Sequence, residues 1–188
     1  MGKAKKIKLF IGLFYVSAVC LFLYFLFSKF SIQEITSYEF IKNNRDFFFN
    51  IKQSNLYLIS IFFFLFSILW VLLAGFLSPL AILAGFIFGK LLGSLLVIFG
   101  CAIGATGLYI FANYYLKKLI REKFLNRFQK LAVKFQKSEF IYLLIYRFIG
   151  GIPFVISNVL PCIFNVKPFN FFLATLIGVT PQIFLVVS

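Results

Sequence analysis

The chain has 188 residues, of which 62% are hydrophobic and 21% aromatic, and its formal net charge is +14. Uncharged stretches of the length that crosses a bilayer, about 20 residues per helix, recur along it and exclude an ordinary soluble domain. The basic residues flank these apolar stretches and have no soluble domain on which to form a binding face. We therefore expect no nucleic-acid partner, and we expect membrane lipids with anionic headgroups as partners.

The first uncharged stretch runs from Leu9 to Phe27, directly after a lysine-rich start. It is longer than the core of a secretory signal, about 7 to 15 residues, and no small-residue cleavage pattern follows it. The segment from Ser28 to Asn55 is polar and nearly neutral. We expect residues 1–55 to form an N-terminal transmembrane helix and a polar loop outside the cytoplasm, followed by a membrane domain over residues 56–188.

Helix-breaking residues interrupt the apolar region between Leu56 and Leu116, which has the length for three crossings. They are Pro79, Gly85, Gly89 and Gly93, with Lys90 among them. Such breaks are tolerated at membrane depth where protein or water satisfies the backbone, so we expect a first re-entrant hairpin at about residues 76–98. Three crossings place the following basic segment in the cytoplasm, whereas a re-entrant hairpin makes the number even and places it outside. The sequence leaves both topologies open.

Three glycines at spacings of four and three follow this hairpin: Gly100, Gly104 and Gly107. At these spacings they share one face of a helix, and small residues let two helices approach closely. A helix contact face is the favoured interpretation.

The basic segment at about residues 117–138 contains eight Lys or Arg residues and one acid, Glu122. Apolar residues recur in it at spacings of three and four, which predicts an apolar stripe along one face of a helix: Ile120, Phe124, Phe128, Leu131 and Phe135. We expect an amphipathic helix lying in the membrane interface. A solvated loop helix that only orients the protein is the alternative.

Residues 146–161 read YRFIGGIPFVISNVLP and place an arginine, two prolines and an asparagine in otherwise apolar sequence. Charge inside a bilayer is costly, so Arg147 is expected to face a polar cavity, a partner or a lipid headgroup. We predict a second re-entrant hairpin at about residues 140–166. The structural alternative for Arg147 is hydrogen bonding to hairpin carbonyls.

Residues that commonly catalyse reactions or bind metals are scarce. There is no histidine, and Cys20, Cys101 and Cys162 each lie in an apolar stretch without paired spacing. Hydrolysis of lipid phosphates needs a general base or a metal, so we expect neither an enzyme nor a metal or other cofactor. The cysteines are interpreted as packing residues.

Two blocks resemble the VTT-domain membrane proteins, which include DedA-like proteins and those termed SNARE-associated Golgi proteins. Residues 84–116 are similar to the family's glycine-rich hairpin and small-residue helix, and residues 146–181 to its later motif series. The family's arginine falls on Arg147, its loop proline on Pro153, its asparagine on Asn158, and its late glycine and proline on Gly178 and Pro181. The chain departs from the family's pattern at Gly150 or Gly151, near Pro161, and at Asn113.

The resemblance implies an all-α polytopic membrane protein, with transmembrane helices, two broken hairpins and the interfacial helix. It also implies transbilayer movement, scrambling or flipping, of phospholipid or a polyprenyl phosphate lipid in a bacterial inner membrane. Two hairpins that meet at the midplane would line a substrate site, in which Arg147 pairs with phosphate, Lys90 supplies a second charge and Asn158 an amide. The hairpin glycines and prolines, Gly150, Gly151 and Pro153 included, are expected to be architectural.

Two alternatives stay open. The first is a proton- or ion-coupled transporter of the DedA-like type, but proton relays use Asp, Glu or His, and no acid lies inside an uncharged stretch. Only the acids of the polar loop, or Glu139 at the mouth of the second hairpin, would serve. The second alternative is a membrane-homeostasis scaffold without transport.

Overall fold

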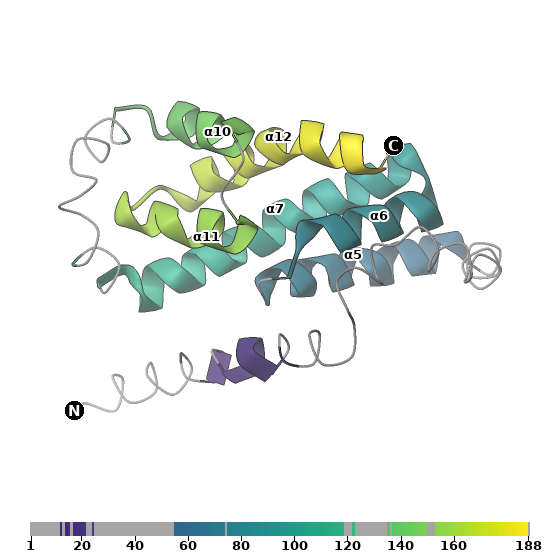
Figure 1. Cartoon of the computed structure of the whole chain (residues 1–188), viewed down its shortest axis with the longest axis horizontal. Coiled ribbons are helices and arrows are strands. Elements are labelled where there is room, and N and C mark those ends of the chain that lie inside the picture. The colour runs from purple at the N-terminus through teal and green to yellow at the C-terminus, as the bar shows by residue number, and fades with distance from the viewer. Residues whose placement is uncertain are drawn as a thin grey trace.

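In the computed structural model the protein is a bundle of helices, shown in Figure 1. The structure describes residues 12, 14–15, 17–21, 24, 55–73, 75–118, 122, 135, 137–149 and 153–187. The polar loop, most of the basic segment at 117–138, and Gly150 and Gly151 lie outside the described residues. The predictions for these segments, the interfacial helix among them, stay predictions.

Helix α5 (Leu56–Leu72) and helix α7 (Lys90–Tyr115) run in the same direction and pack along their length. The three predicted glycines of α7 form this contact. A Cβ atom at Gly104 would lie 2.7 Å from the carbonyl oxygen of Ile68, and one at Gly100 would overlap the Ser67 hydroxyl. The glycine stripe is therefore a helix contact face, and its partner is α5.

Helix α6 (Leu77–Phe88) runs back alongside α7, and the chain reverses again at Gly89. Gly89 has φ 77° and ψ 178°, a conformation that glycine adopts and other residues avoid. The reversal brings α7 against α6 so tightly that a Cβ at Gly93 would lie 2.5 Å from the carbonyl oxygen of Ala84. Pro79 is accommodated because it lies in the first turn of α6, where an amide hydrogen has no helical partner.

The second half of the chain repeats the pattern in the opposite direction. Helix α10 (Glu139–Ile149) is followed by the short helix α11 (Phe154–Val159), the 3₁₀ turn η1 (Leu160–Ile163) and the long helix α12 (Pro168–Val187). Figure 1 shows α10 and α12 running one way along the bundle and α11 the other. Helical hairpins therefore occur in both predicted regions. Whether either re-enters a membrane stays a prediction.

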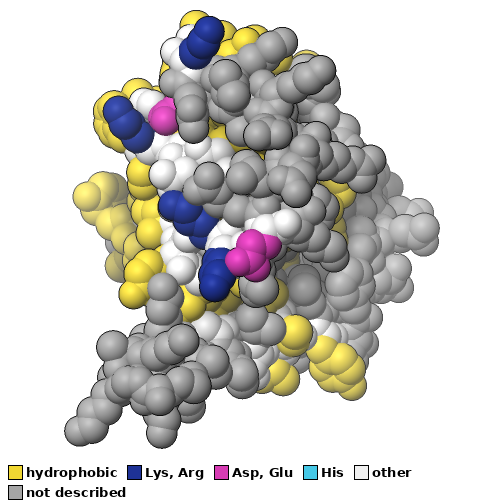
Figure 2. Space-filling view, turned by 90° about the vertical axis from the view of Figure 1, so that its left-hand side faces the viewer, with side chains coloured by type: hydrophobic (Ala, Val, Ile, Leu, Met, Phe, Trp, Pro, Cys, Tyr) yellow, Lys and Arg dark blue, Asp and Glu magenta, His cyan; other side chains and the backbone are white. Residues whose placement is uncertain are grey.

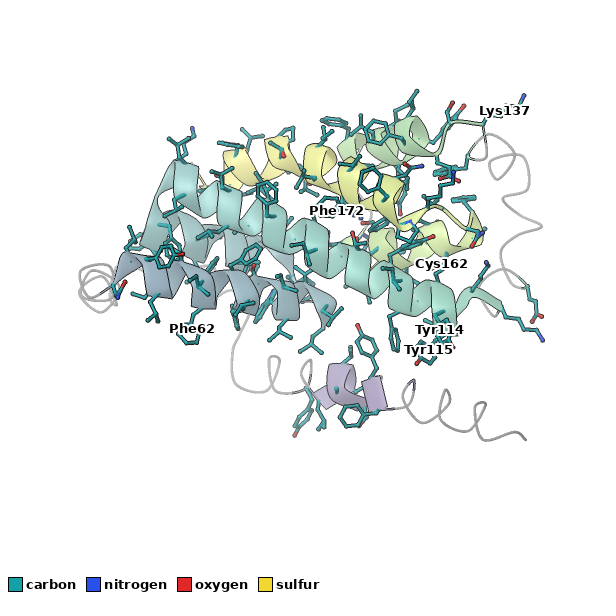
Figure 3. All side chains as sticks on the ribbon, turned by 180° about the vertical axis from the view of Figure 1, so that it is seen from behind. Phe62, Tyr114, Tyr115, Lys137, Cys162 and Phe172 are labelled. Atoms are coloured by element: carbon teal, nitrogen blue, oxygen red, sulfur yellow. The ribbon has the colours of Figure 1, made fainter. Side chains whose placement is uncertain are left out.

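The core lies where α7 and α12 cross. The Tyr109 ring stacks on Phe171 with centroids 4.6 Å apart, and the Tyr109 hydroxyl donates to the carbonyl of Val166 at 2.6 Å. Outer surfaces of the helices remain apolar, and Figure 3 shows Phe62 of α5 pointing away from the bundle. Of the described residues, two helical stretches are long and apolar enough to cross a membrane, 77–115 and 168–187. The stretch 77–115 reverses at Gly89, so only α7 is available for one straight crossing, and α7 is about 39 Å long.

Candidate functional site

A buried arginine lies where α10, α11 and α12 meet. Arg147, in the last turn of α10, is 6% exposed. It approaches α12 closely because Gly178 stands opposite it, and a Cβ atom at Gly178 would lie 2.5 Å from the Cβ of Arg147. Gly178 is near the middle of α12, whose 20 residues span about 30 Å, the thickness of a bilayer's hydrocarbon core. Arg147 is thus buried at mid-height of this helix.

The guanidinium is held by neutral oxygen atoms from two helices. Its Nη1 donates to the Ser157 hydroxyl at 2.7 Å, and its Nη2 donates to Asn158 Oδ1 at 2.6 Å and to Thr175 Oγ1 at 3.0 Å. The Phe171 ring faces the cation, with its centroid 5.0 Å from Cζ. None of the described carboxylates forms a salt bridge with Arg147. The charge is therefore solvated by dipoles and an aromatic face but not neutralised by them.

The breaks around α11 present Ser157 and Asn158 to the arginine. Pro153 is the N-cap residue of α11, with φ −49° and ψ 133°, and its ring fixes the backbone where the helix begins. The helix is only 6 residues long, and the chain then tightens into the 3₁₀ turn that contains Pro161. Asn165 follows with φ 54°, which asparagine tolerates better than most residues. Ser157 and Asn158 of this short helix are buried and face Arg147.

The Asn158 amide is only half satisfied. Its oxygen accepts from Arg147, but its Nδ2 is buried and has no hydrogen-bond partner among the described residues. A buried amide without a partner costs about 1–3 kcal/mol. An unpaired donor beside an uncompensated cation is the combination that an anion would satisfy.

The structure does not bring Lys90 to this site. Lys90 is exposed at the start of α7, one turn beyond Gly85, and Gly85 contacts Val187 at the end of α12. Val187 and Gly178 are nine residues apart on α12, or about 14 Å. Of the three predicted substrate contacts, Arg147 and Asn158 are together and Lys90 lies towards one end of the bundle.

The opposite end of the bundle is rich in lysine. Figure 2 shows lysine side chains and carboxylates gathered there. Lys117 Nζ donates to Asn165 Oδ1 at 2.5 Å, and Lys118 pairs with Glu122 at 3.9 Å. Glu139 accepts from the Asn170 amide at 2.9 Å and from the backbone of Lys167 at 3.2 Å. Both described carboxylates are thus engaged at this basic end.

Ser157, Thr175 and Gln182 contact Arg147 although the sequence analysis did not identify them. Gln182 Nε2 donates to the backbone carbonyl of Arg147 at 3.2 Å. A signal was present, because Thr175 and Gln182 lie three residues before and four residues after Gly178 on the same helix face. No group of three His, Cys, Asp or Glu residues is placed to hold a metal ion in the part of the chain that the structure describes.

Comparison with known families identifies the class of protein. Residues 76–188 match the VTT domain, and since this is more than half of the chain, the protein belongs to the VTT domain family. The match confirms the resemblance seen in the sequence and, with the apolar helices, supports a membrane protein. It begins within the predicted domain at 56–188, whose boundaries stay a prediction. No solved structure matches this chain.

Proposed function

We propose that this protein moves phosphate-bearing lipids, either phospholipid or a polyprenyl phosphate, across the membrane without altering them chemically. Arg147 contacts the phosphate in this proposal, and Asn158 Nδ2 donates to it. The observation that carries it is the buried Arg147, which pairs with no described carboxylate and lies at mid-height of α12. A guanidinium donates two parallel hydrogen bonds to phosphate, a geometry that lysine lacks.

The position of the site fits a lipid substrate. α7 runs about 39 Å, with Lys90 at one end and Lys117 just beyond the other. The lysines attract anionic headgroups at either surface, and Arg147 provides a charge between them. We further propose that the protein resides in a bacterial inner membrane.

The test is lipid movement in proteoliposomes made with wild type, Arg147→Ala and Arg147→Lys, each shown to be folded. Loss of a charge-assisted hydrogen bond corresponds to about 1.5–3 kcal/mol, so we expect the alanine variant to be about 10- to 100-fold slower. Lysine restores part of the rate. Lys137→Ala, which removes an exposed lysine at the basic end, is the matched control and keeps the wild-type rate. A folded Arg147→Ala protein with the wild-type rate contradicts the proposal.

A scaffold without transport is the second candidate, and the hydrogen bonds of Arg147 favour it. They join α10 to α11 and α12, so the arginine also holds the broken segment in place. On this alternative, Arg147→Ala lowers the melting temperature and wild type moves no lipid. Lipid movement by wild type excludes it.

A further inference from the structure

The N-terminal helix packs against the bundle, although it lies outside the residues that match the family. Its described residues are 12, 14–15, 17–21 and 24, and all of them are helical. The Tyr15 ring lies on the Phe111 ring of α7, with centroids 3.9 Å apart, and a Cβ atom at Gly12 would lie 3.2 Å from the Tyr115 ring. The earlier residue of this helix therefore contacts the later residue of α7, so the two helices run antiparallel.

The contact extends to the turn between α5 and α6. The Tyr15 hydroxyl donates a hydrogen bond to the carbonyl oxygen of Leu72, the last residue of α5. The last carbonyls of a helix have no helical donor. The turn itself supplies one for the carbonyl of Trp70, which accepts from the amide of Gly75 at 2.8 Å. Among the described residues, no backbone amide donates to the carbonyl of Leu72, so its donor comes from the N-terminal helix.

This turn lies at a depth where hydrocarbon surrounds the bundle. A Cβ atom at Gly107 would lie 3.0 Å from the end of the Leu72 side chain, so the end of α5 is level with Gly107. Gly107 is eight residues, or about 12 Å, from Tyr115 at the end of α7. With α7 centred in a hydrocarbon core of about 30 Å, the turn lies about 7–8 Å inside it. A carbonyl without a donor is costly at that depth.

Packing of a membrane anchor against its neighbours is the simpler structural interpretation of these contacts. It accounts for the rings of Tyr15 and Phe111 and for the approach of Gly12 to Tyr115, none of which needs a hydroxyl. It does not account for the hydrogen bond from that hydroxyl to the carbonyl of Leu72. Tyr15→Phe separates the two interpretations, because it keeps the ring and removes only the donor.

We propose that Tyr15 is a positioning residue that holds the α5–α6 turn inside the membrane, so that the N-terminal helix is a functional part of the membrane domain and more than an anchor. Its hydroxyl supplies the donor that hydrocarbon lacks. Without this donor, the carbonyl of Leu72 finds a partner by moving towards water at the end of the bundle where Tyr115 lies. This inference goes beyond the proposed function and does not depend on it.

Trp70 reports the position of this turn, because it is the only tryptophan of the chain and lies across the turn. Its Nε1 donates to the carbonyl of Phe76 at 2.8 Å, and a Cβ atom at Gly75 would overlap its indole ring. The tryptophan emission of the full chain in liposomes therefore shows whether the turn meets water or acyl chains.

The test compares quenching of Trp70 by acrylamide in the water with quenching by lipids brominated on their acyl chains. One lost hydrogen bond shifts the equilibrium between two positions of the turn about twofold to tenfold. In Tyr15→Phe we expect acrylamide quenching to rise about twofold or more and quenching by the brominated chains to fall. Tyr24→Phe is the matched control, since it makes the same change at a tyrosine of this helix that is 73% exposed, and it keeps the wild-type quenching.

Unchanged quenching in Tyr15→Phe overturns the inference. An equal rise in Tyr24→Phe also overturns it, because the effect then does not depend on the bond to Leu72. If Tyr15→Phe does not purify as a folded protein, Gly12→Leu is measured instead. Its larger side chain separates the helix from the Tyr115 ring and should raise acrylamide quenching in the same way, and unchanged quenching in that variant overturns the inference as well.

Discussion

The two halves of the bundle use the same order of helices and different means of packing. In the first, α5 to α7, contact depends on small residues, and the described buried polar side chains are two serines, Ser67 and Ser94. In the second, α10 to α12, the buried polar group is the set of Arg147, Ser157, Asn158 and Thr175. The two hairpins therefore differ in what a broken helix provides: close approach in one, and solvation of a charge in the other.

This difference indicates where substitutions should affect stability and where they should affect activity. In the first half, glycines of α7 lie directly against the backbone of neighbouring helices. A methyl group added there must separate the helices. In the second half, another side chain can fill the volume of Arg147, but an uncharged one does not replace its charge. Variants of the two halves should separate these effects.

The largest effect on stability is expected for Gly104→Ala. The added Cβ meets the carbonyl oxygen of Ile68 at 2.7 Å and the Cβ of Val71 at 2.9 Å, so α5 and α7 must move apart. We expect a loss of about 2–3 kcal/mol, measured by equilibrium unfolding in mixed micelles. Gly107→Ala is the control, because its Cβ meets only the flexible end of Leu72 at 3.0 Å, and it should cost less than about 1 kcal/mol. Equal losses at the two positions would contradict close packing at Gly104.

A comparable loss of stability, with a larger loss of activity, is expected for Gly178→Ala. The added methyl group would lie 2.5 Å from the Cβ of Arg147 and 3.8 Å from its Cα, and because a Cβ moves only with its backbone, α10 and α12 must move apart. We expect a loss of about 1–3 kcal/mol in unfolding measurements. Lipid movement should fall more than in Gly104→Ala when both are compared at a temperature where they are folded. The reverse order would show that the two halves do not differ in function.

The smallest effects are expected at the two turns. Gly89→Ala should cost about 1 kcal/mol or slightly more, because of its φ of 77°. No atom lies within 4 Å of the added Cβ, so the cost comes from the backbone alone. Asn165→Gly, at the corresponding turn of the second half, relieves backbone strain but loses the bond to Lys117, and should be near neutral. Thermal unfolding of both variants measures this, and a Gly89→Ala protein as stable as wild type would argue against the tight reversal.

The sequence predicted where helices begin and end better than it predicted which residues of different helices contact one another. Gly89 and Pro153 were expected at breaks, and the structure has helices ending or beginning beside both. Arg147 and Asn158 were expected at one site, and Arg147 Nη2 donates to Asn158 Oδ1 at 2.6 Å. Lys90 was grouped with them, yet it lies near the end of α12. The sequence shows that this lysine is close to a turn, but it does not show where along the bundle that turn lies. Thr175 was overlooked because it is 28 residues from Arg147 and adjacent only through the α10–α12 contact.

The sequence alone determined that this is a VTT-domain chain of apolar helices, and that its buried arginine needs polar surroundings. The family follows from the two blocks of sequence that resemble it. The apolar helices and their breaks follow from composition and from residues such as proline and glycine, whose effects on the backbone are local. Only the tertiary structure decided which oxygen atoms surround the guanidinium, that Gly178 faces the Cβ of Arg147, and that Gln182 bonds its backbone carbonyl. Apolar helices can pack against one another in many registers, and it is the fit of small residues to neighbouring backbones that selects one of them.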